Sequence, residues 1–250
     1  MAGGCRSVAV YSLKGGVGKT TLAVSFAWAA AALSSRRTLL WDLDAQGAAS
    51  FLLGARPNGA RAQAVFAREI APARLVRSTD VAQLALLPAD PSLRTLDRFL
   101  FGLGKKRRLE KLIGEAGRDF DRVILDCPPG LTETSEQVLR AADLVIVPVI
   151  PSPLSRRALD EVLHFLDGNG LRRGAVLPVY NMVDRRRTAH RDALEREPDW
   201  PTVPMASAVE AMAARRQPLG AFAPRSPAAE ALSRLWTGIE RRLARAGEGS

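Results

Sequence analysis

The chain has 250 residues, and a hydrophobic fraction of 47% with 25% charged residues is the composition of a packed globular protein. The formal net charge of +10, carried mainly by arginine, favours anionic partners such as nucleic acid or an acidic membrane surface, although a solubilising surface explains it equally well. No apolar run is long enough to cross a bilayer, the first residues lack the apolar core of a secretory signal, and two cysteines are too few for a disulfide framework, so we expect a cytoplasmic protein.

The first predicted strand, residues 6–11, leads into a glycine-rich turn and then a helical pattern starting near Lys19, which is the context of a phosphate-binding loop. The glycines leave successive backbone N–H groups free to surround phosphate oxygens, and the positive end of the helix dipole points to the same place. Lys19 suits the terminal phosphates, and the Thr20 hydroxyl suits Mg²⁺. The residues that we expect to bind nucleotide are Gly15, Gly16, Val17, Gly18, Lys19, Thr20 and Thr21. A plain glycine-rich turn with solvated lysines is the alternative.

Two further predicted strands end in carboxylates. Residues 38–41 form one strand and lead to Asp42 and Asp44, which a single intervening residue places on the same side. Ligands in open α/β sheets lie at the carboxyl ends of strands, so one or both carboxylates can meet a Mg²⁺-nucleotide or position a water molecule. Residues 122–125 form an apolar strand that ends at Asp126, the pattern of a carboxylate that binds Mg²⁺, usually through water. A capping aspartate and a surface aspartate are the alternative explanation for the first pair.

Strands and helices alternate along the rest of the chain. Apolar strands are predicted at residues 142–149 and 175–180, and the last helix, after Ser226, carries its apolar residues on one face. No internal repeat, low-complexity tract or clear linker divides the sequence. We therefore predict a single α/β domain over residues 1–250, with a mostly parallel, doubly wound sheet, helices on both faces and a disordered tail from about residue 245 to 250.

Three motifs in this order resemble those of the ParA/MinD family of ATPases. They are K-G-G-V-G-K-T-T at residues 14–21, D-L-D-A-Q-G at 42–47 and D-C-P-P at 126–129. Leu13 replaces the first glycine of the usual phosphate-loop pattern, and the additional Lys14 is typical of the family's deviant Walker A loop. The resemblance covers most of the chain. It implies a P-loop fold, ATP and Mg²⁺ as ligands, an ATP-dependent homodimer and slow hydrolysis that a partner protein stimulates.

The resemblance also implies roles for individual residues. Lys14 would reach across the dimer to the second nucleotide, where it offsets the repulsion between two sets of phosphates. Asp44 would orient the attacking water, and Asn181 would read adenine through an amide that both donates and accepts, with a turn asparagine as the alternative. The implied sets are Lys14, Lys19 and Asp44 for catalysis; Thr20, Asp42 and Asp126 for the metal; and Lys14, Pro128 and Asn181 as further nucleotide contacts.

Members of this family differ in what the dimer binds. Net charge and arginine clusters favour non-specific DNA, a nucleoid-associated location and a ParB-like or other cargo protein as partner. The predicted DNA-binding residues are Arg185, Arg186, Arg187, Arg215 and Arg216. A MinD-like membrane attachment would use the apolar face formed by Trp236, Ile239 and Leu243, although such a face is usually part of a core. A scaffold that binds ATP without hydrolysing it is the remaining alternative.

Overall fold

The computed structural model describes residues 5–55, 62–104, 106–170 and 176–248, and within these ranges the strands form one eight-stranded sheet in the order β3-β4-β2-β5-β1-β6-β7-β8. The strands are β1 (Arg6–Val10), β2 (Thr38–Asp42), β3 (Arg77–Ser78), β4 (Leu84–Leu87), β5 (Arg122–Asp126), β6 (Leu144–Val149), β7 (Val176–Val183) and β8 (Thr202–Pro204). Neighbouring strands are parallel except β3 and β4, which are antiparallel. The predicted mostly parallel sheet is therefore confirmed.

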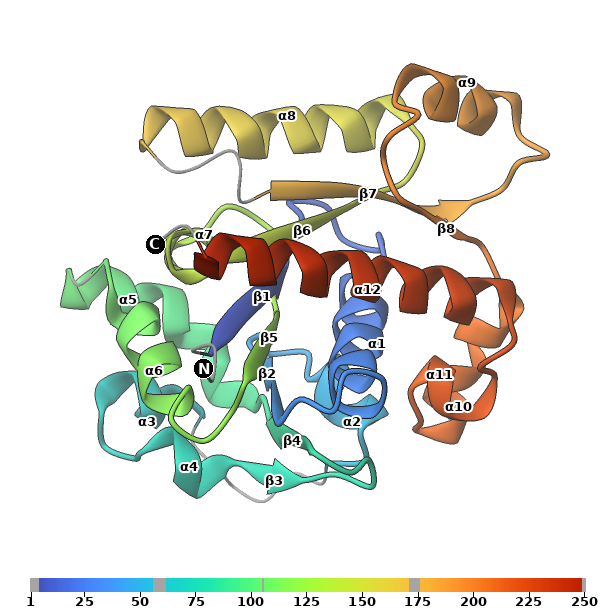
Figure 1. Cartoon of the computed structure of the whole chain (residues 1–250). Coiled ribbons are helices and arrows are strands. Elements are labelled where there is room, and N and C mark those ends of the chain that lie inside the picture. Colours follow the sequence, from blue (N-terminus) through green and yellow to red (C-terminus); the bar gives the residue numbers. More distant parts are fainter. Residues whose placement is uncertain (1–4, 56–61, 105, 171–175, 249–250) are drawn as a thin grey trace.

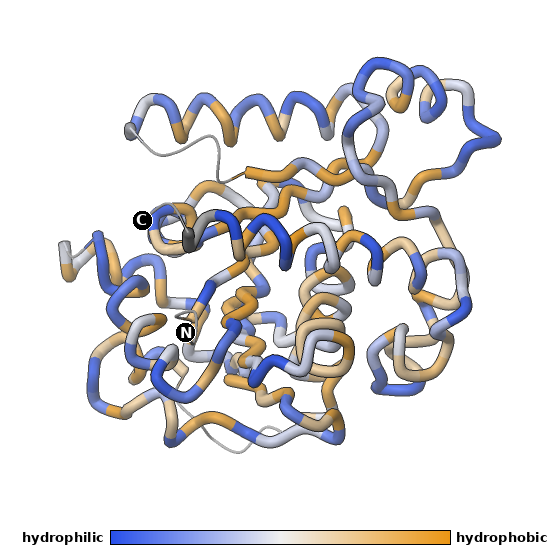
Figure 2. The backbone as a smooth tube through the Cα atoms, in the orientation of Figure 1, coloured by the Kyte–Doolittle hydropathy of each residue, from blue (hydrophilic) through white to orange (hydrophobic). Residues whose placement is uncertain are grey.

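Helices cover both faces of this sheet (Figure 1). They are α1 (Lys19–Ala32), α2 (Ala48–Leu52), α3 (Ala62–Ala67), α4 (Pro72–Leu75), α5 (Leu96–Leu103), α6 (Arg108–Ala116), α7 (Glu133–Ala141), α8 (Pro153–Gly168), α9 (Thr188–Arg196), α10 (Ala211–Arg215), α11 (Leu219–Phe222) and α12 (Pro227–Glu248). One buried cluster joins α1 and α12 to the sheet, and a second joins α5, α6, α7 and α8 to its other face. Figure 2 shows the resulting alternation of hydrophobic and hydrophilic residues along α8.

The C-terminal helix differs from expectation. Residues 245–248, which we predicted to belong to a disordered tail, continue α12, because alanine and arginine favour helix and Leu243 is still anchored in the core. Residues 249–250 of the predicted tail lie outside the described residues. The apolar face of α12 is buried against α1 and the sheet, with Trp236 at 1% and Ile239 at 0% exposure, so these side chains form core and not a membrane-facing surface.

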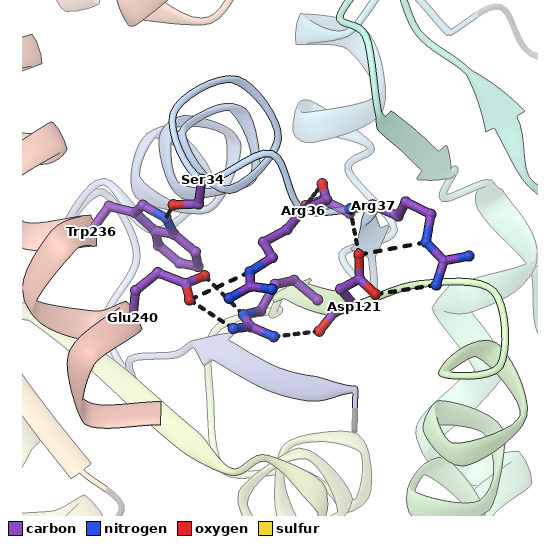
Figure 3. A network of polar contacts seen from close by, with 8 residues as sticks. Ser34, Arg36, Arg37, Asp121, Trp236 and Glu240 are labelled. Carbon is purple, nitrogen blue, oxygen red and sulfur yellow. Dashed lines mark hydrogen bonds and ion pairs between the residues drawn. The ribbon is translucent and has the colours of Figure 1, made fainter. Parts of the chain in front are cut away.

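A polar network fastens α12 to the amino-terminal end of β5 (Figure 3). Arg122 donates two hydrogen bonds to Glu240, Nε to Oε1 at 2.9 Å and Nη2 to Oε2 at 2.7 Å. Trp236 Nε1 donates to Ser34 Oγ at 2.9 Å, which joins α12 to the end of α1. Since α1 starts at the phosphate loop and β5 ends at Asp126, the network fixes both functional elements from their far ends.

Breaking this ion pair should lower stability strongly. Glu240→Ala leaves the Arg122 guanidinium, whose side chain is only 7% exposed, without its carboxylate, so we expect a loss of about 3–5 kcal/mol of unfolding free energy in urea titrations. Glu230→Ala is the matched control on the same helix. Its partner Arg234 is 72% exposed, and the loss should stay below about 1 kcal/mol. Equal losses in the two variants would contradict the assigned role of the buried pair.

Candidate nucleotide-binding site

The glycine-rich turn lies between β1 and α1, at the point where the strand order reverses. Strand β1 has β5 on one side and β6 on the other, and such switch points are where open α/β sheets bind ligands. Gly16 and Gly18 have φ of +71° and +88°, a left-handed backbone that favours glycine. At Gly18 a Cβ atom would lie 2.4 Å from Asn181 Nδ2, so no side chain fits there. The turn therefore has the backbone geometry of a phosphate cradle.

Lys19, the first residue of α1, is almost buried beneath this turn. Its Nζ donates to the Lys14 carbonyl at 3.2 Å, and the residue as a whole is only 8% exposed. Burial lowers the pKa of Lys19, while the nearby carboxylates of Asp126 and Asp44 act in the opposite direction. A buried ammonium group next to free backbone N–H groups is well suited to bind phosphate oxygens.

Asp126, at the end of β5, is buried in an unusual way. It is 0% exposed, and within the described residues neither carboxylate oxygen has a hydrogen-bond partner. Burial raises its pKa well above the usual range, and Asp42 across the strand pair adds to this. The Thr20 hydroxyl, which lies close to the carboxylate without reaching hydrogen-bond geometry, and Lys19 act against it. Buried polar atoms without partners are rare in proteins, so these oxygens are suited to bind a cation.

Asp42 lies beside Asp126 but, unlike it, has hydrogen-bond partners for both carboxylate oxygens. Its Oδ2 accepts hydrogen bonds from the backbone N–H and hydroxyl of Ser50, at 2.8 and 2.7 Å, and Oδ1 accepts from the Asp44 N–H at 3.2 Å. Burial raises the pKa of Asp42 to about 6 against the effect of these bonds. Asp42 thus shapes the turn that carries Asp44 and starts α2, while a contact of Asp42 with the metal stays a prediction.

Asn181 lies at the site but is engaged with the protein. Its Nδ2 donates to the Val17 carbonyl at 2.8 Å, so one half of the amide holds the phosphate loop. Next to it is a mostly apolar cavity of 170 Å³, smaller than the roughly 300–1,000 Å³ of whole-ligand sites and closer to the size of one base. Four of the residues that line this cavity were not predicted from the sequence: Met182, Pro204, Met205 and Val209. No motif marks these residues, which lie in β7 and in the segment from β8 to Val209, far along the chain from the phosphate loop.

Lys14 and Pro128, both partly exposed, belong to the glycine-rich turn and to the turn after β5, respectively. The Lys14 N–H donates to Ser12 Oγ at 3.2 Å and its carbonyl holds Lys19, which fixes the backbone at this position. In the part of the chain that the structure describes, no carboxylate forms an ion pair with the Lys14 ammonium group. Pro128 is half-buried in the turn after β5. The backbone at Lys14 is thus fixed, while its side chain is partly exposed.

Comparison with known proteins identifies the family. A family model described as an AAA domain matches residues 5–169. The chromosome partitioning protein ParA of Myxococcus xanthus is 32% identical over 167 residues, which is 65% of this chain and 58% of that protein. The chain belongs to the ParA/MinD family of P-loop ATPases.

Solved structures agree with the ParA/MinD fold. Cobyrinic acid a,c-diamide synthase from Mycobacterium smegmatis, with a bound ATP analogue and magnesium, matches with a TM-score of 0.81 at 29% identity over 95% of this chain and 94% of that one. The cell division ATPase MinD of Pyrococcus furiosus has a TM-score of 0.79 at 23% identity, over 96% of this chain and 99% of that one. The second likeness supports the fold alone. Magnesium and nucleotide binding are therefore features of this fold family.

The predicted DNA-binding arginines form two separate groups in this ParA/MinD chain. Residues 185–187 are exposed before α9, and Arg186 donates to both oxygens of Asp184, at 2.9 and 3.0 Å. Arg215 and Arg216 end α10 and stack on Phe222 and Phe51, with 5.1 and 4.3 Å between guanidinium carbon and ring centroid. Figure 1 places α9 and α10 at different corners of the molecule. A single DNA surface would have to extend between them.

Two searches of the described residues concern other ligands. None of the helices there is long and apolar enough to cross a membrane. No group of three or more His, Cys, Asp or Glu side chains in those ranges could hold a metal ion by itself. Mg²⁺ is usually held by one or two carboxylates together with substrate phosphates and water. Asp126 and Thr20 are the side chains that fit this description.

Proposed function

We propose that the chain is a Mg²⁺-dependent ATP hydrolase whose ATP-bound state is a homodimer. The observation that carries the proposal is the buried carboxylate of Asp126, which has no hydrogen-bond partner among the described residues and lies near Lys19 and Thr20. A ligand that only accepts hydrogen bonds would not compensate these oxygens, but a cation held against nucleotide phosphates would. The bound Mg²⁺ would neutralise charge on the terminal phosphates during transfer to water.

Different residues of this chain would bind the phosphates, the metal ion, the attacking water and the base. The backbone N–H groups of the turn and Lys19 would bind the phosphates, and Thr20 and Asp126 would hold the metal. Asp44 is partly exposed at the end of β2, where its carboxylate could accept a proton from the attacking water. The cavity beside Asn181 would take the base. This division is supported by the position of each group at the carboxyl ends of β1, β2, β5 and β7.

A second copy of the chain would complete the site. Lys14 is the group that supports this, because its backbone is fixed while its ammonium group has no ion pair with a described carboxylate. Two nucleotides facing each other carry many negative charges, which a lysine from each copy would offset. Nucleotide state would then control dimer state. The exposed Leu131 and Leu154, at 47% and 68% exposure in the segments after β5 and β6, offer apolar area for such a contact.

In the ATP state we expect the dimer to bind DNA without sequence preference and to position DNA or protein cargo with a stimulating partner. The net charge of +10 supports DNA as a partner, and the Myxococcus relative is named a chromosome partitioning protein. The test is binding of a fluorescent duplex of arbitrary sequence, compared with anionic phosphatidylglycerol vesicles. Retention on DNA with ATP and not with ADP, decreasing with salt, supports the proposal. Retention on the vesicles alone would support a MinD-like membrane role.

Reversing charge before α9 should weaken DNA binding. Arg185→Glu combined with Arg187→Glu keeps the Arg186–Asp184 pair, breaks the longer Arg187–Asp184 contact of 3.8 Å, and removes two cations that could meet phosphates. We expect the slope of log affinity against log salt to fall by about two and affinity at low salt to drop at least roughly tenfold. Arg157→Glu on α8, where the arginine is 78% exposed and paired with Glu161, is the control. Equal losses of DNA affinity in both variants would show that the residues before α9 are not the DNA-binding surface.

A further inference from the structure

The turn between β5 and α7, residues 127–132, connects Asp126 to a firmly fixed helix start. Thr132 and Ser135 form a capping box, in which the Thr132 N–H donates to Ser135 Oγ at 2.7 Å. Asp97 of α5 accepts hydrogen bonds from the Thr134 N–H and hydroxyl, at 2.9 and 2.6 Å. The turn thus starts directly from β5 and ends at an anchored helix start, while its middle is more open, with Leu131 47% exposed.

Tyr11 anchors that middle. Its hydroxyl donates to the Gly130 carbonyl at 3.0 Å, and its ring is 0% exposed. Its backbone N–H donates to the Ile146 carbonyl of β6 at 3.0 Å, so the residue is fixed at the centre of the sheet. Tyr11 also directly precedes Ser12, whose hydroxyl accepts the Lys14 N–H. One rigid side chain therefore joins the start of the phosphate loop to the turn that follows Asp126.

The hydroxyl is the part of Tyr11 that the core does not require. A phenylalanine would fill the same apolar volume among its buried neighbours, since the two side chains differ only in the hydroxyl group. A buried hydroxyl has a desolvation cost unless it finds a partner. Here it donates to the Gly130 carbonyl of the turn beside the site, and the Ser135 hydroxyl of the adjoining capping box also lies close to it. Gly130, with φ of +92°, has the backbone conformation that brings the turn to this contact.

We infer that Tyr11 is a positioning residue, whose hydroxyl holds residues 128–131 at a fixed separation from the phosphate loop and so sets the backbone that follows Asp126 at the terminal phosphate. The inference rests on the proposed ATPase function. Without the hydroxyl the turn would sample other arrangements, and fewer molecules at any moment would have the arrangement needed for hydrolysis. Binding of ADP, which depends on the phosphate loop itself, would be unaffected.

The test compares Tyr11→Phe with Tyr180→Phe. The chain has two tyrosines, and Tyr180 is the matched control because it is also buried and its hydroxyl donates to a backbone carbonyl, that of Ala193 in α9, at 3.2 Å. Hydrogen exchange by mass spectrometry follows the peptide covering residues 128–135. Single-turnover assays measure the rate of ATP hydrolysis, and titration measures the affinity for ADP.

For Tyr11→Phe we expect amide exchange in that peptide to become roughly three- to tenfold faster, the effect of one lost hydrogen bond on local opening. The rate of hydrolysis should fall about fivefold with unchanged KM for ATP and unchanged ADP affinity. Tyr180→Phe should change none of these values. Wild-type exchange in the peptide, or faster exchange with an unchanged hydrolysis rate, would overturn the inference. If the wild type itself fails to hydrolyse ATP, the proposed function is contradicted, and the exchange data alone decide whether the tether exists.

Discussion

Asp126→Asn should stabilise the ligand-free protein while nearly eliminating hydrolysis of Mg²⁺-ATP. The asparagine keeps the shape of the side chain but removes a charge that is 0% exposed and has no partner among the described residues, so a gain of about 1–3 kcal/mol is expected at neutral pH. The same charge is what a metal ion requires. Hydrolysis should therefore fall on the order of 10²–10³-fold, as for the loss of one strong electrostatic contact in a transition state.

The pH dependence of this stabilisation has a definite sign. The pKa of Asp126 is raised well above its unfolded value of 3.8, mainly by burial. Between the unfolded and folded pKa values the native protein holds a proton that the unfolded chain has released, so native stability falls as pH rises through this window. The advantage of Asp126→Asn should be absent near pH 4 and complete above the folded pKa. The pKa of Asp42 is raised to about 6, so ionisation of Asp42 also lowers native stability with rising pH, in the wild type and in Asp126→Asn alike.

Urea unfolding at several pH values measures this effect, and Asp121→Asn is the control. Asp121 accepts hydrogen bonds from Arg37, at 2.9 Å from the backbone and 3.1 Å from Nη2, and its pKa is lowered, chiefly by this arginine. Its replacement should therefore destabilise the protein instead. A destabilised Asp126→Asn, or one that still hydrolyses ATP at the wild-type rate, would show that Asp126 is not a metal-binding group.

Lys14→Ala should prevent dimerisation in ATP without preventing nucleotide binding. In light scattering the variant should keep the 27.0 kDa mass of one chain in Mg²⁺-ATP, whereas the wild type should reach twice this mass. The contact from the Lys14 carbonyl to Lys19 is made by the main chain and survives the substitution, so ADP affinity should change by less than about fivefold.

Lys106→Ala serves as the control for Lys14→Ala. Lys106 is exposed between α5 and α6, outside the elements that form the nucleotide site, and its loss removes the same positive charge. It should dimerise like the wild type. An ATP-dependent dimer of Lys14→Ala would contradict the role across the interface, and failure of both variants would point to net charge as the cause.

The sequence predicted those parts of the site that depend on local chain direction. The glycine-rich turn, the start of α1 at Lys19 and the strand ending at Asp126 each follow from a few adjacent residues. The contacts around them could not be predicted, because they join distant segments. Ser50 donates hydrogen bonds to the carboxylate of Asp42, and Arg122 pairs with Glu240, which lies 118 residues further along the chain.

Arg216 illustrates a second limit. Arg216 adopts the left-handed conformation that favours glycine, with φ of +51°, and closes α10. Its guanidinium group then stacks on Phe51 of α2. An arginine in a position suited to glycine cannot be recognised from residue type, since the stacking contact that accompanies it comes from a segment far away in the chain.

The most direct test of the central claim is a single-turnover assay with radiolabelled ATP and excess protein. The proposed Mg²⁺-ATP site at Lys19, Thr20 and Asp126 predicts that bound ATP is converted to ADP and phosphate when Mg²⁺ is present and stays intact in EDTA. ATP that remains intact in Mg²⁺ for as long as in EDTA would contradict the assignment of this chain as an ATP hydrolase.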